Sequence, residues 1–66
     1  MNGTEDHATV EEAIQSLKAR GFIEAGRDHY RHLNLLENGY TQRADVFNPW
    51  PHKTPIGRIS FWNAVA

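Results

Sequence analysis

The side chains best suited to chemistry are four histidines and a group of aromatic and charged residues in the middle of the chain. His32 and Asp45 lie in two strand-like segments, HYRHLNLLE and YTQRADVF, which are joined by Asn38-Gly39. Residues that face each other across an antiparallel pair have Cβ atoms about 4.5–5.5 Å apart, close enough for a carboxylate–imidazole hydrogen bond. An oriented histidine suits acid–base catalysis or phosphate binding. The same pair is also an ordinary stabilising contact on a solvated sheet, and both interpretations stay open.

Three aromatic residues, Tyr30, Phe47 and Trp50, form a second candidate site near the open end of the same segments. Tryptophan, tyrosine and arginine dominate the binding energy of protein interfaces. Interleaved with Arg27, Arg31 and Arg43, these rings could equally stack the bases of a single-stranded nucleic acid. A structural interpretation is that the tryptophans complete a core that is short of aliphatic residues.

The spacing of His29 and His32 raises the question of a metal site. On a helix the two rings would share a face, but on a strand a separation of three residues sends them to opposite faces. His52 lies in a different segment, so no set of three ligands follows. The chain has no cysteine, and therefore no thiolate site and no disulfide. We predict no metal and no other cofactor.

A hairpin is the element that must position these residues. Asn38-Gly39 tolerates the positive φ that a two-residue type I′ turn requires. Such a turn sets Glu37 opposite Tyr40. The register then pairs Tyr30 with Phe47, His32 with Asp45, and Asn34 with Arg43.

This register predicts two different faces of the hairpin. The aliphatic face should pack on a helix and contains Leu33, Leu35, Ala44 and Val46. The opposite face should point away from the helix and contains Tyr30, His32, Asn34, Arg43, Asp45 and Phe47.

An amphipathic helix is predicted from about residue 10 to residue 20. Thr9 and Glu12 have the spacing of a capping box, in which each side chain satisfies a free amide of the first turn. Gly21 supplies the residue that ends the helix. Apolar side chains recur at helical spacing between these points, at Val10, Ala13, Ile14 and Leu17.

The remaining chain predicts strands at about 22–25, 29–36 and 40–47, and a proline-rich loop over 48–55 that holds Trp50 between two prolines. The C-terminal segment favours a strand over about 58–62, with a helix over about 56–65 as the alternative. The predicted fold is therefore α+β, with one N-terminal amphipathic helix on a small antiparallel sheet of two to three strands and a central Asn-Gly hairpin.

Composition narrows the class of protein. The chain has 66 residues and a formal net charge of −1, and we expect one small domain over 1–66 with residues 1–8 disordered. Residues 1–26 carry five acidic and two basic side chains, whereas residues 27–66 carry five basic and three acidic ones. A general nucleic-acid binder usually has a strongly basic face, and this chain has at most a mildly basic half.

No apolar run approaches the ~20 residues of a membrane span, so we expect a cytoplasmic protein without a membrane partner.

Several short motifs together resemble the HicA-type mRNA interferase toxins. The segment LKARGF at 17–22 is similar to the end of their first helix, the segment 26–29 resembles the element before their catalytic histidine, and Pro51-His52 resembles their Pro/His element. The resemblance implies a double-stranded-RNA-binding-domain-like fold of helix, three strands and helix. It also implies that His29 is the general acid or base for RNA cleavage, with Arg27 and Arg31 on the phosphates.

The function predicted from these observations is a non-enzymatic interaction module. It would bind a protein partner through the hairpin face and the Pro49-Trp50-Pro51 tip. The binding residues would be Tyr30, His32, Arg43, Asp45, Phe47 and Trp50. The alternative is a HicA-like RNA-binding or RNA-cleaving protein that uses His29, for which a C-terminal helix would be expected. Self-association through a free strand edge is also compatible with so small a sheet.

Overall fold

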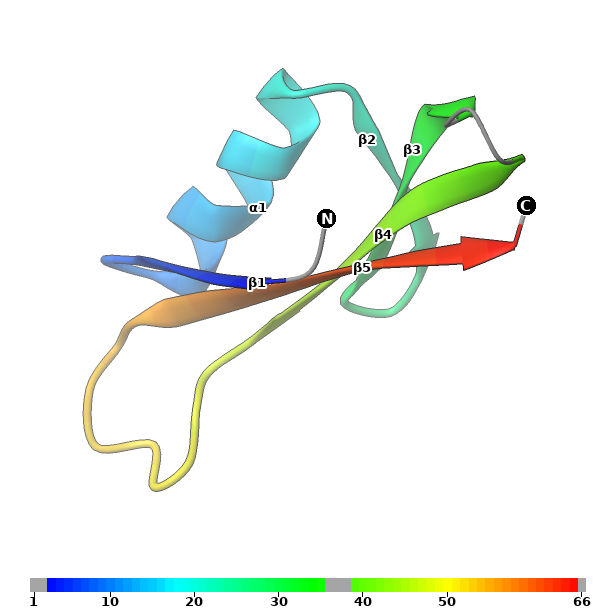
Figure 1. Cartoon of the computed structure of the whole chain (residues 1–66). Coiled ribbons are helices and arrows are strands. Elements are labelled where there is room, and N and C mark those ends of the chain that lie inside the picture. Colours follow the sequence, from blue (N-terminus) through cyan, green and yellow to red (C-terminus); the bar gives the residue numbers. More distant parts are fainter. Residues whose placement is uncertain (1–2, 36–38, 66) are drawn as a thin grey trace.

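The described part of the chain, residues 3–35 and 39–65, forms one helix and one five-stranded antiparallel sheet in this computed structural model. In chain order the elements are β1 (Gly3–His7), α1 (Val10–Ala19), β2 (Phe22–Gly26), β3 (His29–Leu35), β4 (Tyr40–Phe47) and β5 (Gly57–Val65). The strand order is β1-β5-β4-β3-β2, so β2 to β5 form a meander and β1 adds to its free edge (Figure 1). α1 connects the two edge strands and therefore crosses one face of the sheet.

The prediction of a two- to three-stranded sheet was wrong, because the described residues contain five strands. One of the additional strands lies at the N-terminus, where residues 1–8 were expected to be disordered. β1 is short, polar and mostly exposed, but it pairs with β5 over all five of its residues. Backbone pairing with a nine-residue neighbour stabilises it without an apolar pattern that the sequence could show.

The C-terminal segment is the strand β5, so the alternative of a helix over about 56–65 was wrong. β5 lies between β1 and β4 and pairs with both. A central strand of this length supplies hydrogen bonds on both edges, which explains why it extends beyond the predicted 58–62.

The helix begins and ends where its capping residues predict. The Thr9 side chain accepts a hydrogen bond from the Glu12 amide at 3.1 Å, and Gly21 follows the helix with φ at +94°. Ala13 and Leu17 are fully buried, whereas Val10 and Ile14 are half-buried at the margin of the core. The apolar stripe thus packs α1 onto the sheet.

The core lies between α1 and one face of the sheet, and it confirms the inward orientation of Ala44 and Val46. Tyr30 was predicted to point away from the helix, and that prediction was wrong because its side chain is only 3% exposed. The small Ala44 side chain directly opposite leaves room for the Tyr30 ring. The buried core consists of Ala13, Leu17, Phe22, Tyr30, Ala44, Val46 and Ile59.

The predicted hairpin register was also wrong. Asp45 pairs with His29 instead of His32, and Tyr30 pairs with Ala44 instead of Phe47. A shift of three residues exchanges the two faces of β3, because neighbouring side chains of a strand alternate. The predicted Glu37–Tyr40 pair, Asn38 and the side chains of Leu33, Asn34 and Leu35 lie outside the described residues.

An irregularity in β3 accounts for two of these three residues, and the third is already present beside the connection, where Leu35 pairs with Thr41. Arg31 pairs with Arg43 and Leu35 pairs with Thr41, so four steps along β3 match two steps along β4. Extra residues of this kind are β-bulges, which the turn sequence does not reveal. Gly39 has the expected positive φ, at +72°. The first described pair beside the connection is nevertheless Leu35 with Thr41, which does not belong to the predicted register.

Gly57 permits the closest approach between the helix and the sheet. A Cβ atom at this position would lie 2.5 Å from both the Thr9 carbonyl oxygen and the Val10 Cα. Backbone atoms at the start of α1 cannot move aside as a flexible side chain would. The absence of a side chain at Gly57 therefore lets α1 begin directly against β5.

Gly57→Ala should destabilise the protein by about 2 kcal/mol, because the added methyl group forces α1 away from β5. Urea unfolding followed by circular dichroism measures the loss. Gly3→Ala is the matched control, since a Cβ at Gly3 meets nothing within 4 Å. Equal urea midpoints for the two variants would contradict the packing described here.

Candidate functional site

The face of the sheet that α1 leaves uncovered, here called the open face, carries most of the chemistry-bearing side chains. Ala44, Val46 and Ile59 point into the core, so their chain neighbours point the opposite way. The pairings between β3, β4 and β5 then place the rows of this face side by side. Its central residues are His29, Arg31, Arg43, Asp45, Phe47, Arg58, Ser60 and Trp62.

His29 and Asp45 form a hydrogen-bonded pair on the open face. Nδ1 of His29 contacts Oδ1 of Asp45, and the two side chains are 61% and 35% exposed. An ionised carboxylate only accepts hydrogen bonds, so Nδ1 is the donor. In the neutral ring Nε2 is then left as the acceptor. The structure thus contains the predicted carboxylate–histidine pair, but with His29 in place of His32.

Arg31 and Arg43 face each other one row further along the same face. Neither forms an ion pair within residues 3–35 and 39–65, and Nε of Arg43 is buried without a hydrogen-bond partner. Their neighbours across the sheet are Ile23 on β2 and Trp62 on β5. Two unpaired cations therefore lie between two apolar side chains.

Asn48 organises the loop that joins β4 to β5. Its side-chain amide donates to the carbonyl oxygens of Thr54 and Ile56, both at 2.8 Å. The other side of this amide, Oδ1, lies 2.9 Å from Nδ1 of His52. These bonds cross-link both halves of the loop.

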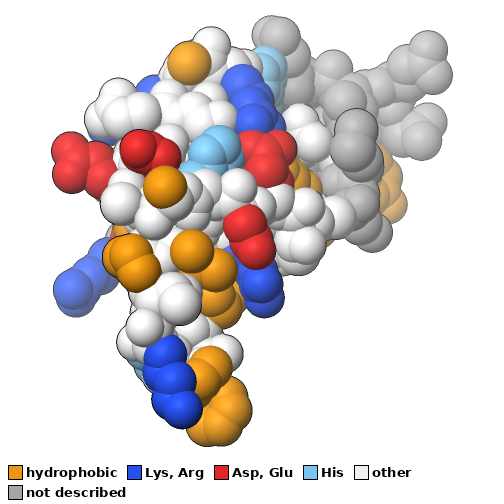
Figure 2. Space-filling view, turned by 90° about the vertical axis from the view of Figure 1, so that its left-hand side faces the viewer, with side chains coloured by type: hydrophobic (Ala, Val, Ile, Leu, Met, Phe, Trp, Pro, Cys, Tyr) orange, Lys and Arg blue, Asp and Glu red, His pale blue; other side chains and the backbone are white. Residues whose placement is uncertain are grey.

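The loop projects from the sheet (Figure 1), and Trp50 lies within it. The side chain of Trp50 is 85% exposed, and a cis peptide bond follows it. Hydrophobic side chains and a basic side chain meet at the end of this projection (Figure 2). The loop therefore presents a large apolar side chain to solvent.

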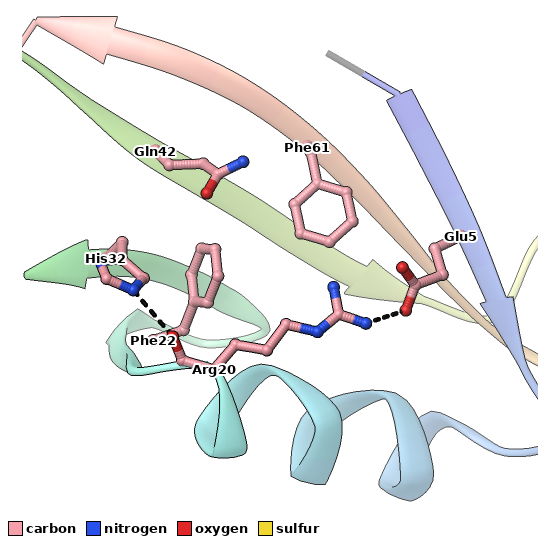
Figure 3. Close-up of a pocket in the computed structure, with 6 residues that line it drawn as sticks. All are labelled: Glu5, Arg20, Phe22, His32, Gln42 and Phe61. Atoms are coloured by element: carbon pink, nitrogen blue, oxygen red, sulfur yellow. Dashed lines mark hydrogen bonds and ion pairs between the residues drawn. The ribbon is translucent and has the colours of Figure 1, made fainter. Parts of the chain in front are cut away.

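A cleft of about 340 Å³ lies on the helix side of the sheet, near the end of α1 (Figure 3). His32 lines this cleft, so its predicted place on the open face was wrong. Nε2 of His32 donates to the Arg20 carbonyl at 2.8 Å and satisfies a free acceptor at the helix end. The centres of the His32 and Phe22 rings lie 5.1 Å apart, and the two rings meet edge to face. The other lining residues are Glu5, Arg20, Gln42 and Phe61.

An ion pair between Arg20 and Glu5 connects α1 to β1 across this cleft (Figure 3). The Arg20 guanidinium also lies 5.8 Å from the centre of the Phe61 ring, and His7 approaches the same Glu5 oxygen at 2.6 Å. The hydrogen bond from Arg20 is the main cause that holds the pKa of Glu5 below its ordinary value. These contacts connect the edge strand β1 to the C-terminal end of α1.

A second ion pair fastens the same edge strand from the open face. Arg58 donates to both carboxylate oxygens of Asp6, at 2.7 and 3.1 Å. This hydrogen bonding holds the pKa of Asp6 below its ordinary value and raises that of Arg58. Unlike Arg31 and Arg43, Arg58 therefore has a carboxylate partner among the described residues.

The predicted binding residues therefore separate into three places. Arg43, Asp45 and Phe47 share the open face, and Trp50 lies on the adjoining loop. His32 lines the cleft. Tyr30 belongs to the core, where burial raises the pKa of its hydroxyl group.

The residue that the sequence reasoning missed on the open face is Trp62. It alternates with Ser60 and Arg58 on β5, and this alternation is visible in the sequence. The strand at 40–47 was predicted, but its pairing with the C-terminal strand was not, so the face of Trp62 could not be assigned. Pairing with Arg43 brings it to the centre of the open face.

Among residues 3–35 and 39–65, no group of three or more histidine or acidic side chains is placed to hold a metal ion. Nor does this part of the chain contain a helix with the length and apolar character needed to cross a membrane. The chain matches none of the protein-family models, curated proteins or solved structures with which we compared it. Functional proposals for this chain therefore rest on its own residues.

Acid should weaken the Arg20–Glu5 pair. The pKa of Glu5 is lower in the folded chain than its ordinary value of 4.5. The ion pair therefore stabilises the folded state fully above pH 4.5, and this stabilisation disappears as the pH falls through the folded pKa. Glu5→Gln should cost about 0.5 kcal/mol at neutral pH, a small value because the pair is partly open to solvent.

Urea midpoints measured as a function of pH check this expectation. The gap between the wild-type protein and Glu5→Gln should close below pH 4.5, where Glu5 itself becomes neutral. Glu24→Gln is the control on an exposed position outside this ion pair. A gap that stays constant down to strongly acidic pH would show that the carboxylate charge is not what matters.

Proposed function

We propose that this chain is a non-enzymatic binding module that docks a protein partner on its open face and on the loop that carries Trp50. The observation that carries the proposal is the presentation of Trp50. Its side chain is 85% exposed, although the loop beneath it is cross-linked by Asn48. A tryptophan with this exposure contributes little to the core, so packing does not explain its position.

Trp50 has the properties of an interface anchor. Tryptophan is the residue type most enriched among those whose truncation costs an interface 2 kcal/mol or more. A loop that is already ordered loses less conformational entropy on binding than a flexible one. The hydrogen bonds of Asn48 thus prepare Trp50 for a partner.

The open face supports the same proposal because its apolar surface leads to the loop. Phe47 ends β4 directly before the loop and is 41% exposed. Trp62 and Ile23 are half-buried on the same face. Aromatic and arginine side chains that lie together on one surface are typical of protein interfaces.

Trp50→Ala should reduce partner affinity by about 30-fold, equivalent to about 2 kcal/mol, and leave the fold unchanged. The measurement is affinity capture from a lysate of the source cells, with mass spectrometry to compare the proteins retained, followed by titration of the recovered partner. Tyr40→Ala is the matched control, since Tyr40 is also exposed but lies at the opposite end of β4. Undiminished capture by a folded Trp50→Ala variant would exclude this role for the loop.

A second candidate function is RNA binding or cleavage that uses His29. The specific observation in its favour is the His29–Asp45 hydrogen bond, which orients an exposed imidazole beside Arg31. A neutral Nε2 so oriented is suited to accept a proton from a ribose hydroxyl group, and arginine suits phosphate contact. The architecture differs from the helix, three strands and helix of the HicA-type toxins, because β5 stands where the second helix would be.

If this second function holds, the purified protein should cleave RNA, and His29→Ala should abolish cleavage but retain binding. The assay uses labelled single-stranded RNA at low salt, where phosphate contacts are strongest. His52→Ala is the control, because His52 is bonded to Asn48 within the loop. Cleavage that persists in His29→Ala, or RNA that neither binds nor breaks, would exclude the function.

A further inference from the structure

The facing arginines on the open face form an incomplete arrangement. Arg31 and Arg43 occupy directly paired positions of β3 and β4, where like charges destabilise a sheet. Two other arginines, Arg20 and Arg58, each form an ion pair with a carboxylate. In the described part of the chain, Arg31 and Arg43 have none.

The burial of Arg43 strengthens this contrast. Its Nε atom is buried without a hydrogen-bond partner, although a buried donor left unpaired costs about 1–3 kcal/mol. The nearest acidic residue on its own strand and face is Asp45, which is bonded to His29. Neither guanidinium group of the facing pair therefore has a carboxylate partner among the described residues.

We infer that Arg31 and Arg43 form a carboxylate-binding site for an acidic peptide segment of the protein partner. The inference rests on the proposed function and names the chemistry of the segment that docks. A guanidinium group binds a carboxylate through parallel hydrogen bonds, and a carboxylate between the two arginines would relieve their repulsion.

The neighbours of the two arginines define the rest of the segment. Across the sheet the row reads Ile23, Arg31, Arg43 and Trp62, with apolar side chains at both ends and cations in the middle. A complementary peptide carries an acidic residue between apolar ones.

The charges around the row favour such a peptide over a nucleic acid. Asp45 and Asp6 lie on the same face, and the whole chain has a net charge of −1. A nucleic-acid strand carries a charge at every phosphate and would bring several of them close to these carboxylates. A peptide with one or two carboxylates meets the arginines without that repulsion.

The test is a titration of the isotopically labelled full chain, followed by NMR signals of the Arg43 Nε–H and Trp62 indole groups. The probes are a capped hexapeptide of alternating leucine and glutamate, the same peptide with glutamine in place of glutamate, and a single-stranded hexauridylate. The acidic peptide should shift both signals and bind at least 10-fold more tightly than the other two probes.

Variants connect this binding to the arginine pair. Arg43→Gln should weaken the acidic peptide at least 10-fold, while Lys18→Gln, which removes an exposed positive charge on α1 outside the row, should leave its affinity unchanged. Arg31→Gln should also weaken the peptide and yet raise the urea midpoint of the free protein, because it removes a like-charge contact. If the two arginines only stabilised the fold, Arg31→Gln would instead lower the urea midpoint of the free protein.

The outcomes are distinguishable. Equal affinities for the glutamate and glutamine peptides, or no shift of either signal, would overturn the inference. Tighter binding of hexauridylate would overturn it and assign the row to nucleic acid. Each of these results concerns the arginine row alone, whereas failure of the proposed function shows as unchanged partner capture by Trp50→Ala.

Discussion

The burial of Tyr30 against α1 and the sheet decides which side chains of this protein face solvent. Once its ring occupies the core beside Ala44, alternation along β3 sends His29 and Arg31 to the open face and His32 to the helix side. The cleft, the His29–Asp45 pair and the row of facing arginines all follow from that orientation. A ten-residue helix covers only one face of a five-stranded sheet, so side chains such as His29, Arg31 and Phe47 on the other face are exposed.

The elements of the fold were more predictable than their arrangement. The cap at Thr9 and Gly21 located α1 because a helix end is determined by a few neighbouring residues. β1 left no comparable signal, since an edge strand is held by backbone bonds and by ion pairs to distant residues such as Arg58. The register of β3 depends on an irregularity between Arg31 and Leu35, which Asn38-Gly39 does not reveal.

The candidate site was predictable where exposure follows from local chemistry. Trp50 stands between two prolines, and the loop presents it as that sequence indicates. Membership of a sheet face is different, because a shift by an odd number of residues exchanges every side chain of a strand. That exchange moved Tyr30 to the core and replaced His32 with His29 beside Asp45. Trp62 required knowledge of its partner strand, which only the assembled sheet provides.

The distribution of ion pairs separates structure from recognition in this chain. Glu5 and Asp6 on the edge strand β1 each bind an arginine, so their charges stabilise an edge of the sheet. On the central strands, Arg31 and Arg43 have no carboxylate partner within residues 3–35 and 39–65, and their like charges reduce the stability of a small chain. Carboxylates are available in this chain and are used elsewhere. Proteins commonly retain such destabilising groups where function requires them, which is the physical basis for proposing that an external carboxylate binds this pair.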